Sequence, residues 1–246
     1  MMCAEDKNRL RRCLAFPGEL GGHQGTEYFV NILKPHITRQ LIIKFSKKMR
    51  FLLSFLLLLN IGCSAGAKSY LDSIADYRKQ YVADLLSDPR SPLQPARAKD
   101  LSFFPPDHDY CVWASVSLTP GSVPFLIQTH SGKQKPFREY ATLTFTIHDS
   151  TLVLHAYQSI DMLNNAAHKE ELFVPFTDIT NYDATYGGGR YIDLSINDIR
   201  DNTIQLDFNK CYNPYCAYAD GFSCPIPPKE NGLPIEINAG EKAFRR

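Results

Sequence analysis

Beyond about residue 110, apolar side chains alternate with polar ones over short segments, and this period of two constrains the fold more than any other feature of the chain. Such runs, separated by Gly, Pro, Asn and Asp, are typical of half-buried strands. The candidate strands cover 111–118, 123–128, 141–148, 151–157, 171–176, 190–196, 203–208 and 233–238. Eight short strands predict a mainly β domain, built as an antiparallel sandwich or barrel.

One N-terminal amphipathic helix is expected in front of this domain, which makes the overall class α+β. Ser69, followed three residues later by Asp72, resembles a capping box with Asp in place of Glu or Gln. Three prolines between residues 89 and 95 end the helix, so we expect a helix and linker over 69–98 and the β-rich domain over 99–246. Apolar side chains recur at spacings of three and four at Leu71, Ile74, Tyr81, Val82 and Leu85.

An export signal is predicted upstream, because the apolar run at 51–63 is too short to cross a membrane as a helix, which needs roughly 20 apolar residues. Lys47, Lys48 and Arg50 give the run a positive flank, and Gly62 lies directly before Cys63, as lipoprotein processing requires. We therefore expect lipid attachment at Cys63. The alternative is a cytoplasmic segment over 1–48 followed by a short membrane anchor over 51–61.

This signal divides the chain. Because Met49 begins it, residues 1–48 are interpreted as a non-native upstream extension, 49–62 as the signal peptide and 63–68 as a flexible tether. The protein is expected to be exported and lipid-anchored in the bacterial cell envelope. Ser64 lacks the Asp that signals retention at the inner membrane, which favours the outer membrane facing the periplasm.

The charge balance argues against a nucleic-acid partner. Residues 1–50 hold 10 of the 27 Lys and Arg residues but 4 of the 26 Asp and Glu residues, so the remainder has 17 basic and 22 acidic side chains, a net charge of −5. A mildly acidic domain without a basic aromatic stripe has no electrostatic attraction to phosphate backbones. The expected partners are the membrane, reached through the lipid, and an unknown small molecule.

A hairpin between 190–196 and 203–208 would concentrate charge. If it is symmetric about Arg200, Asp193 lies across from Asp207 with β-carbons roughly 4.5 to 5.5 Å apart. Two such carboxylates need a cation, an arginine or a shared proton between them, and Arg190 is near enough in sequence to be the counter-charge. The alternative is a shifted register in which each carboxylate caps a loop or meets an exposed lysine.

Four segments near this hairpin resemble a known family. TYGGGRYIDL (185–194), LDFNKCYNPYCAY (206–218), SCPIPPKENGLPI (223–235) and AGEK (239–242) are similar to the bacterial family called domain of unknown function 1684, and FFPPD (103–107) and ELFVPFTDIT (171–180) extend the resemblance over about 70–242. The family has no established activity, so the resemblance implies positions rather than chemistry. Cys211 departs from its pattern. The matching positions are Gly188, Gly189, Arg190, Tyr191, Asp193, Asp207, Asn209, Tyr212, Asn213, Pro214, Cys216, Tyr218, Cys224, Pro225, Pro228, Glu230 and Asn231.

Cys216 and Cys224 enclose a seven-residue loop, and a disulfide between them is plausible in an oxidising compartment. The alternatives are buried thiols, a thiol nucleophile at Cys216, or a metal ligand. No histidine follows His168, so two cysteines alone leave a zinc site incomplete, and no metal or cofactor is expected.

Two functions are consistent with these residues. The first is a non-catalytic envelope lipoprotein whose β-rich domain has a ligand-binding or structural site around Arg190, Asp193, Asp207 and Asn209. The second is an enzyme, such as a hydrolase, in which Asp193 or Asp207 is a general acid or base, Arg190 binds an anionic group and Cys216 is a second-choice nucleophile. The candidate ligand-binding residues are Arg190, Tyr191, Asn209, Asn213, Glu230 and Asn231.

Overall fold

The computed structural model describes residues 68–245, which belong to one compact unit, Ala65–Arg246. The predicted extension, signal peptide and lipidated Cys63 lie outside the described residues. In the described range, no helix has the length and apolar character needed to span a bilayer.

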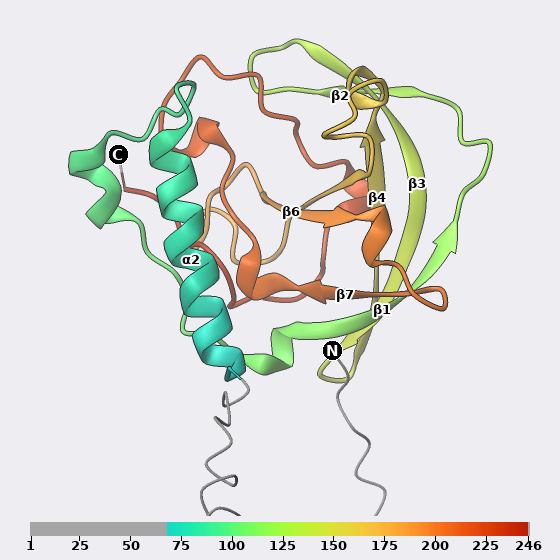
Figure 1. The fold of residues 1–246 in the computed structure, drawn as a ribbon, viewed down its shortest axis with the longest axis horizontal. Helices are drawn as coiled ribbons and strands as arrows, with labels where there is room; N and C mark the ends of the chain where they lie inside the picture. Colours follow the sequence, from blue (N-terminus) through green and yellow to red (C-terminus); the bar gives the residue numbers. More distant parts are fainter. Residues whose placement is uncertain (1–67, 246) are drawn as a thin grey trace, which may run out of the picture. The chain divides into compact units, whose positions relative to one another are not determined.

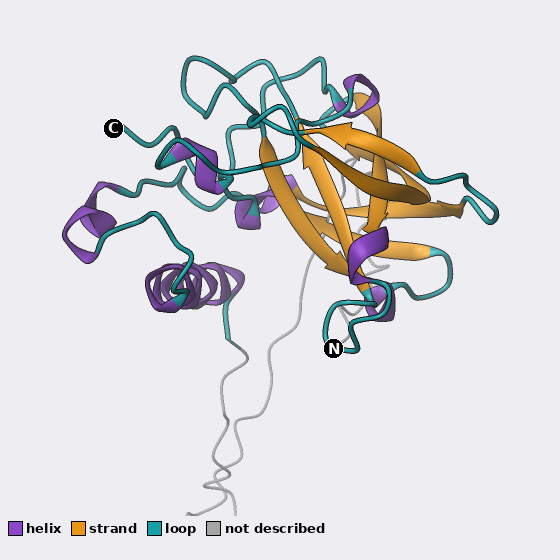
Figure 2. Ribbon diagram, turned by 90° about the horizontal axis from the view of Figure 1, so that it is seen from above, coloured by secondary structure: helices purple, strands orange, loops and turns teal. Residues whose placement is uncertain are grey.

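Seven antiparallel strands form one curled sheet, which has the shape of a half-barrel (Figure 2). The strand order in the sheet is β6-β5-β4-β3-β1-β7, and β2 pairs with the N-terminal end of β3. The mainly β, antiparallel prediction is therefore confirmed, but the sheet is a single open half-barrel and not the predicted sandwich or closed barrel. The strands are β1 (Cys111–Leu118), β2 (Phe125–Gln128), β3 (Gln134–Ile147), β4 (Ser150–Ser159), β5 (Glu171–Phe176), β6 (Arg190–Ser195) and β7 (Thr203–Asp207).

The eighth predicted strand, 233–238, is wrong. Leu233 and Ile237 are buried as its alternation suggested, but the segment forms no strand. Two isolated backbone hydrogen bonds tie it to the loop after β5, from Leu233 N–H to the carbonyl of Thr177 and from Ile179 N–H to the carbonyl of Ile235. Side chains satisfy Ile237: its N–H donates to Asp178, and its carbonyl accepts from Arg190. A period of two reports which side chains are buried, and it does not report which groups satisfy the backbone.

The first predicted hairpin, β3–β4, is confirmed, with Ile147 opposite Ser150. The second is wrong, because β6 pairs with β5 and β7 pairs with β1. Asp193 therefore lies opposite Phe173, and Asp207 lies opposite Cys111. A short 3-10 helix, Ile196–Asp198, follows β6 directly and turns the chain away before a hairpin can form.

Both faces of the sheet bury apolar side chains, in two separate clusters. The inner face packs the main core, which includes Leu143, Leu172, Ile192 and Leu206. On the outer face, toward one end, Phe137, Tyr157 and Phe173 form a second cluster with Phe125 and Ile127. Strand β5 reads as a continuous apolar run because both of its faces are covered there.

The predicted helix is present as α2 (Tyr70–Ser87), with Ser69 as its N-cap accepting from the N–H of Asp72 at 3.1 Å. It is the single α-helix of residues 68–245, and it begins well inside the chain rather than at its N-terminus. Two of its side chains, Ile74 and Leu85, are buried, whereas Leu71 and Leu86 are exposed. Figures 1 and 2 show α2 lying beside the C-terminal loops, away from the faces of the sheet.

Tyrosine hydroxyl groups connect α2 to the rest of the domain. Tyr70 donates to Asp207 at 2.9 Å, Tyr77 donates to the carbonyl of Lys210 at 3.0 Å, and Tyr81 donates to Glu241 at 3.0 Å. These directional contacts, more than a broad apolar stripe, fix the position of α2.

Gly240 allows the C-terminal segment to pack closely on the loop after β7. Its φ of +74° is in the left-handed region, and an added Cβ would lie 2.2 Å from Sγ of Cys211 and 2.7 Å from the carbonyl oxygen of Phe208. Only glycine satisfies both the conformation and the space.

We predict that Gly240→Ala destabilises the protein far more than Gly221→Ala. Gly221 has a similar φ of +90° but open space around it, so its substitution should cost only the backbone strain, about 1 kcal/mol. The Gly240 substitution adds a clash with backbone atoms and should cost several times more. Urea unfolding of both variants measures the difference, and equal losses would show that the close packing at Gly240 is unimportant.

Candidate functional site

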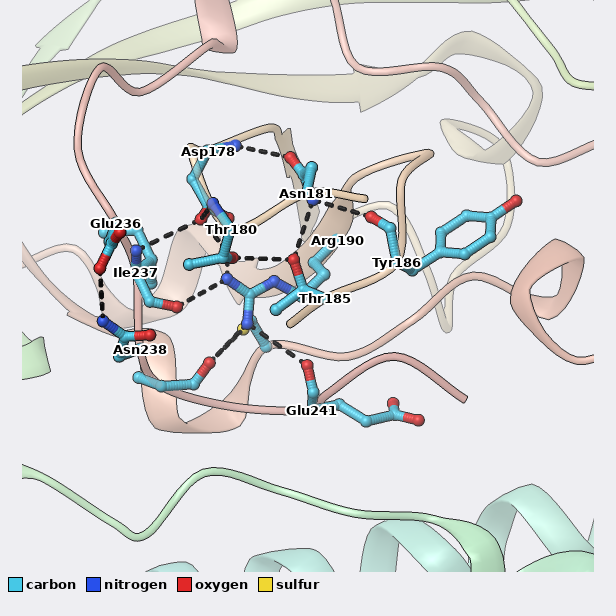
Figure 3. A network of polar contacts seen from close by, with 12 residues as sticks. Asp178, Thr180, Asn181, Thr185, Tyr186, Arg190, Glu236, Ile237, Asn238 and Glu241 are labelled. Carbon is cyan, nitrogen blue, oxygen red and sulfur yellow. Dashed lines mark hydrogen bonds and ion pairs between the residues drawn. The ribbon is translucent and has the colours of Figure 1, made fainter. Parts of the chain in front are cut away.

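Arg190 is fully buried and cannot contact a ligand in this structure. Its guanidinium forms an ion pair with Asp178 at 2.8 Å and donates to the carbonyls of Ile237 at 2.9 Å and Ala239 at 2.5 Å (Figure 3). Asp178 also accepts from the backbone N–H and hydroxyl of Thr180. The expected ligand-binding role of Arg190 is corrected to a structural one: it joins the loop after β5 to the C-terminal segment.

The three predicted asparagines are likewise buried connectors. Asn209 donates to the carbonyl of Asp107 at 2.7 Å and accepts from its N–H at 2.9 Å. Asn213 donates to the carbonyl of Lys242, and Asn231 bonds both backbone groups of His155. Each amide matches a backbone donor or acceptor, so these side chains fix loops. Glu230 is exposed and lines neither of the two pockets described below.

Asp207 has a mixed environment. It is 4% exposed, and its Oδ1 accepts from the hydroxyl of Tyr70 at 2.9 Å and the N–H of Asn209 at 3.1 Å. Oδ2 lies 3.6 Å from Nζ of Lys210. The predicted opposed pair of Asp193 and Asp207 across a ladder is wrong, although both carboxylates line one pocket between the two strand edges.

Asp193 is reached by solvent but is surrounded by protein. Its Oδ2 accepts a 2.6 Å hydrogen bond from the hydroxyl of Tyr212. Desolvation raises the pKa of Asp193 to about 6, the hydrogen bond from Tyr212 acts in the opposite direction, and the charge of Glu171 adds to the rise. Burial and the charge of Asp193 hold the pKa of Tyr212 well above its ordinary value, so this phenol remains a donor.

A large pocket lies beside Asp193, between the outer face of β3 to β6 and the loop 212–225. We call it the aromatic pocket; its volume is about 690 Å³, within the range of small-molecule sites. Ring pairs run along it, with centroids 5.6 Å apart for Phe137 and Phe173, 4.7 Å for Phe173 and Tyr191, and 5.9 Å for Tyr191 and Tyr212. Its aromatic residues are Phe137, Phe173, Tyr191, Tyr212, Tyr215 and Phe222.

Several charged side chains around the aromatic pocket already have partners. Arg90 forms an ion pair with Asp88 at 2.9 Å, and His168 contacts Glu171 at 2.6 Å. Lys135 also lines the pocket, and its charge acts on the thiol of Cys224. Asp161 and Asp193 are the other acidic residues of the lining, and Asp193 is held in place by the half-buried phenol of Tyr212.

Cys216 and Cys224 are thiols in this structure rather than a disulfide. The N–H of Cys216 donates to Sγ of Cys224 at 3.2 Å, and Sγ of Cys216 donates to the carbonyl of Phe222 at 3.2 Å. Burial raises the pKa of the Cys224 thiol to about 12, which disfavours the thiolate. Cys224 is therefore a poor thiol nucleophile.

Of the polar groups, Glu241 was missed from the sequence, although it lies in the AGEK motif. It is fully buried and accepts from the hydroxyls of Tyr81 at 3.0 Å and Tyr218 at 2.7 Å and from the N–H of Asn213 at 2.9 Å. Desolvation raises its pKa to about 7, and these three hydrogen bonds act in the opposite direction. The aromatic pocket was also not predicted from the sequence. The continuous apolar run of 171–176 indicated that both faces of this strand are covered, and it could have pointed to the pocket.

The raised pKa of Glu241 makes stability depend on pH. Between its ordinary value of 4.5 and about 7 the folded chain binds more protons than the unfolded chain, so the free energy of unfolding falls as pH rises through this window. We predict that Glu241→Gln removes about 1 kcal/mol of the loss seen between pH 6 and 7. Urea unfolding at several pH values measures it, with the exposed Glu236→Gln as control. Identical pH profiles for wild type and Glu241→Gln would contradict the raised pKa.

Within residues 68–245, no three His, Cys, Asp or Glu side chains are placed to hold a metal ion together. The arrangement can do two things chemically: enclose an apolar body against aromatic rings, and present the carboxylate of Asp193 to it, with Asp161 and Glu171 also in the lining.

Comparisons with known proteins place this geometry in context. The family model described as Protein of unknown function (DUF1684) matches residues 97–242. The solution NMR structure of the uncharacterized protein from gene locus rrnAC0354 of Haloarcula marismortui is similar, with 36% identity and a TM-score of 0.53, covering 70% of this chain and 96% of that chain. No curated protein matches significantly. The family resemblance seen in the sequence is confirmed over residues 97–242.

Proposed function

Because the chain belongs to the family described as Protein of unknown function (DUF1684), which names no activity, we propose a function from the pocket itself: the domain binds a small, mainly apolar molecule that has a hydrogen-bond-donating end. The observation that carries this proposal is the carboxylate of Asp193, held at 2.6 Å by the hydroxyl of Tyr212 at the edge of the aromatic pocket.

The aromatic side chains of the pocket and the carboxylate of Asp193 make different contacts with the ligand in this proposal. The rings of Phe137, Phe173 and Tyr191 offer an apolar surface, and burying a ligand against it removes apolar area from water. Asp193 accepts a hydrogen bond from the ligand. A partly desolvated carboxylate gains more from such a bond than an exposed one, because fewer waters compete for it.

A non-catalytic role fits the surroundings of Asp193 better than hydrolysis by a carboxylate pair. Asp207 is occupied by Tyr70 and Asn209, and it belongs to the attachment of α2. Arg190 is sealed in the domain and cannot bind an anionic group.

One observation does favour a second function. A carboxyl with a pKa of about 6 can act as a general acid or base near neutral pH. In that case Asp193 would act alone in the aromatic pocket. An Asp193→Asn variant that keeps ligand binding but no longer converts the ligand would favour this enzyme over the binding protein.

We predict that N-phenyl-1-naphthylamine, a neutral aromatic probe with one N–H donor, binds the aromatic pocket and gains fluorescence. Asp193→Asn should weaken binding by about fivefold, because a charge-assisted hydrogen bond becomes a neutral one. Phe222→Ala should weaken it through lost apolar contact.

The matched control is Val153→Ala, an exposed apolar residue of β4 that lies outside the pocket lining. Melting temperatures check that each variant is folded. Unchanged probe affinity in both pocket variants, or an equal loss in the control, would contradict the proposal.

We also propose that the domain works outside the cytoplasm as a lipid-anchored protein of the cell envelope, with the outer membrane favoured. The support is the apolar run at 51–61, its basic flank and the Gly62-Cys63 pair. Residues 64–68 then give a short tether between the lipid and α2.

Intact-mass analysis of protein extracted from bacterial membranes tests this part of the proposal. We predict an acylated species that begins at Cys63, and its loss in Cys63→Ser but not in Cys111→Ser. A chain that begins at Met1 without acyl groups would show that the export signal is not used.

A further inference from the structure

A second pocket, separate from the aromatic one, lies where the curled sheet fails to close. Strands β6 and β7 are the two ends of the sheet order, and they face each other beside α2 without pairing (Figure 1). A cavity of about 390 Å³ lies along this seam, and we call it the seam pocket. Its chemically distinctive lining residues are Tyr77, Trp113, Asp193, Asp198, Asp207 and Lys210.

The charge in the seam pocket is unbalanced. Three carboxylates line it against one ammonium group, that of Lys210. Clustered carboxylates with a single cation attract further positive charge, because each raises the energy of its ionised neighbours.

One oxygen of Asp207 supplies an independent sign of a missing hydrogen-bond donor. Asp207 is 4% exposed, and its Oδ2 atom receives no hydrogen bond from any described residue. The ammonium group of Lys210 lies 3.6 Å away, beyond hydrogen-bond distance. A buried carboxylate oxygen without a donor is costly, and a bound cation with N–H groups would satisfy it.

Aromatic rings define what kind of cation fits. Trp113 is 64% exposed on the outer face of β1, where Ser115 and Ser117 are its neighbours on the same side. Nζ of Lys210 already lies 5.7 Å from the ring centroid of Tyr77. The pocket thus combines carboxylates with ring faces, the combination that recognises organic ammonium groups.

We propose that the seam pocket binds a small organic dication of the aliphatic diamine class. One ammonium group donates to Oδ2 of Asp207 beside Lys210, and the other lies between Asp198 and the indole of Trp113. Two positive charges balance the excess of two carboxylates. The absence of a three-residue metal cluster among residues 68–245 agrees with an organic rather than a metallic cation.

Trp113 makes the test direct, because the chain contains a single tryptophan. Putrescine titrated into the protein at constant ionic strength should change tryptophan emission saturably, whereas neutral 1,4-butanediol should not. Asp198→Asn, at an exposed position, should weaken putrescine binding by about fivefold. The matched control is Asp201→Asn, in the same connection but outside the pocket lining.

Calorimetry repeats the titration, so that a complex without a change in emission is also detected, and it measures Trp113→Ala. We expect a further loss of affinity in that variant, since the ring contact is removed. No saturable binding, equal binding of Mg²⁺, or unchanged affinity in Asp198→Asn would each overturn the proposal.

The two pockets share Asp193, so their tests must be kept apart. Asp198 and Trp113 line only the seam pocket, and Phe222 lines only the aromatic pocket. Binding of the naphthylamine probe should therefore survive Asp198→Asn and Trp113→Ala, and the failure of either proposal leaves the other intact.

Discussion

The guanidinium of Arg190 holds the end of the sheet and the C-terminal segment in one arrangement. Its partners come from two chain segments, Asp178 after β5 and the carbonyls of residues 237–241. Removing one partner of such a buried ion pair leaves an uncompensated charge, which typically costs about 3 to 5 kcal/mol. Gly240 and Glu241 follow directly in that segment, so the close packing on Cys211 and the attachment of α2 both depend on Arg190 being in place.

An open sheet is the second constraint. Because β6 and β7 remain unpaired, the seam between them is lined by side chains, including Tyr77 of α2, and is not closed by backbone hydrogen bonds. Asp193 belongs to β6, an edge strand of the sheet, and lines both the seam pocket and the aromatic pocket. A closed barrel would have paired these edges and removed the seam.

Tyrosine hydroxyls carry much of the connection between α2 and the domain, and two of them end on carboxyl groups that are almost fully buried, Asp207 and Glu241. This explains why α2 buries few aliphatic side chains yet has a defined position. Polar side chains near the C-terminus make contacts of the same kind: Asn209, Asn213 and Tyr218 satisfy buried backbone or carboxyl groups.

The sequence by itself determined the family, the mainly antiparallel β class, the α2 segment with its Ser69 cap and most strand positions, because these follow from local periodicity, capping chemistry and motif strings. Tertiary structure alone decided strand pairing: alternation in β6 and β7 assigns their faces but not their neighbours, so the Asp193–Asp207 hairpin was wrong. It also decided that Arg190 is sealed in while Asp193 faces a pocket, since burial of a polar side chain depends on segments distant in sequence, here residues 178 and 237–241.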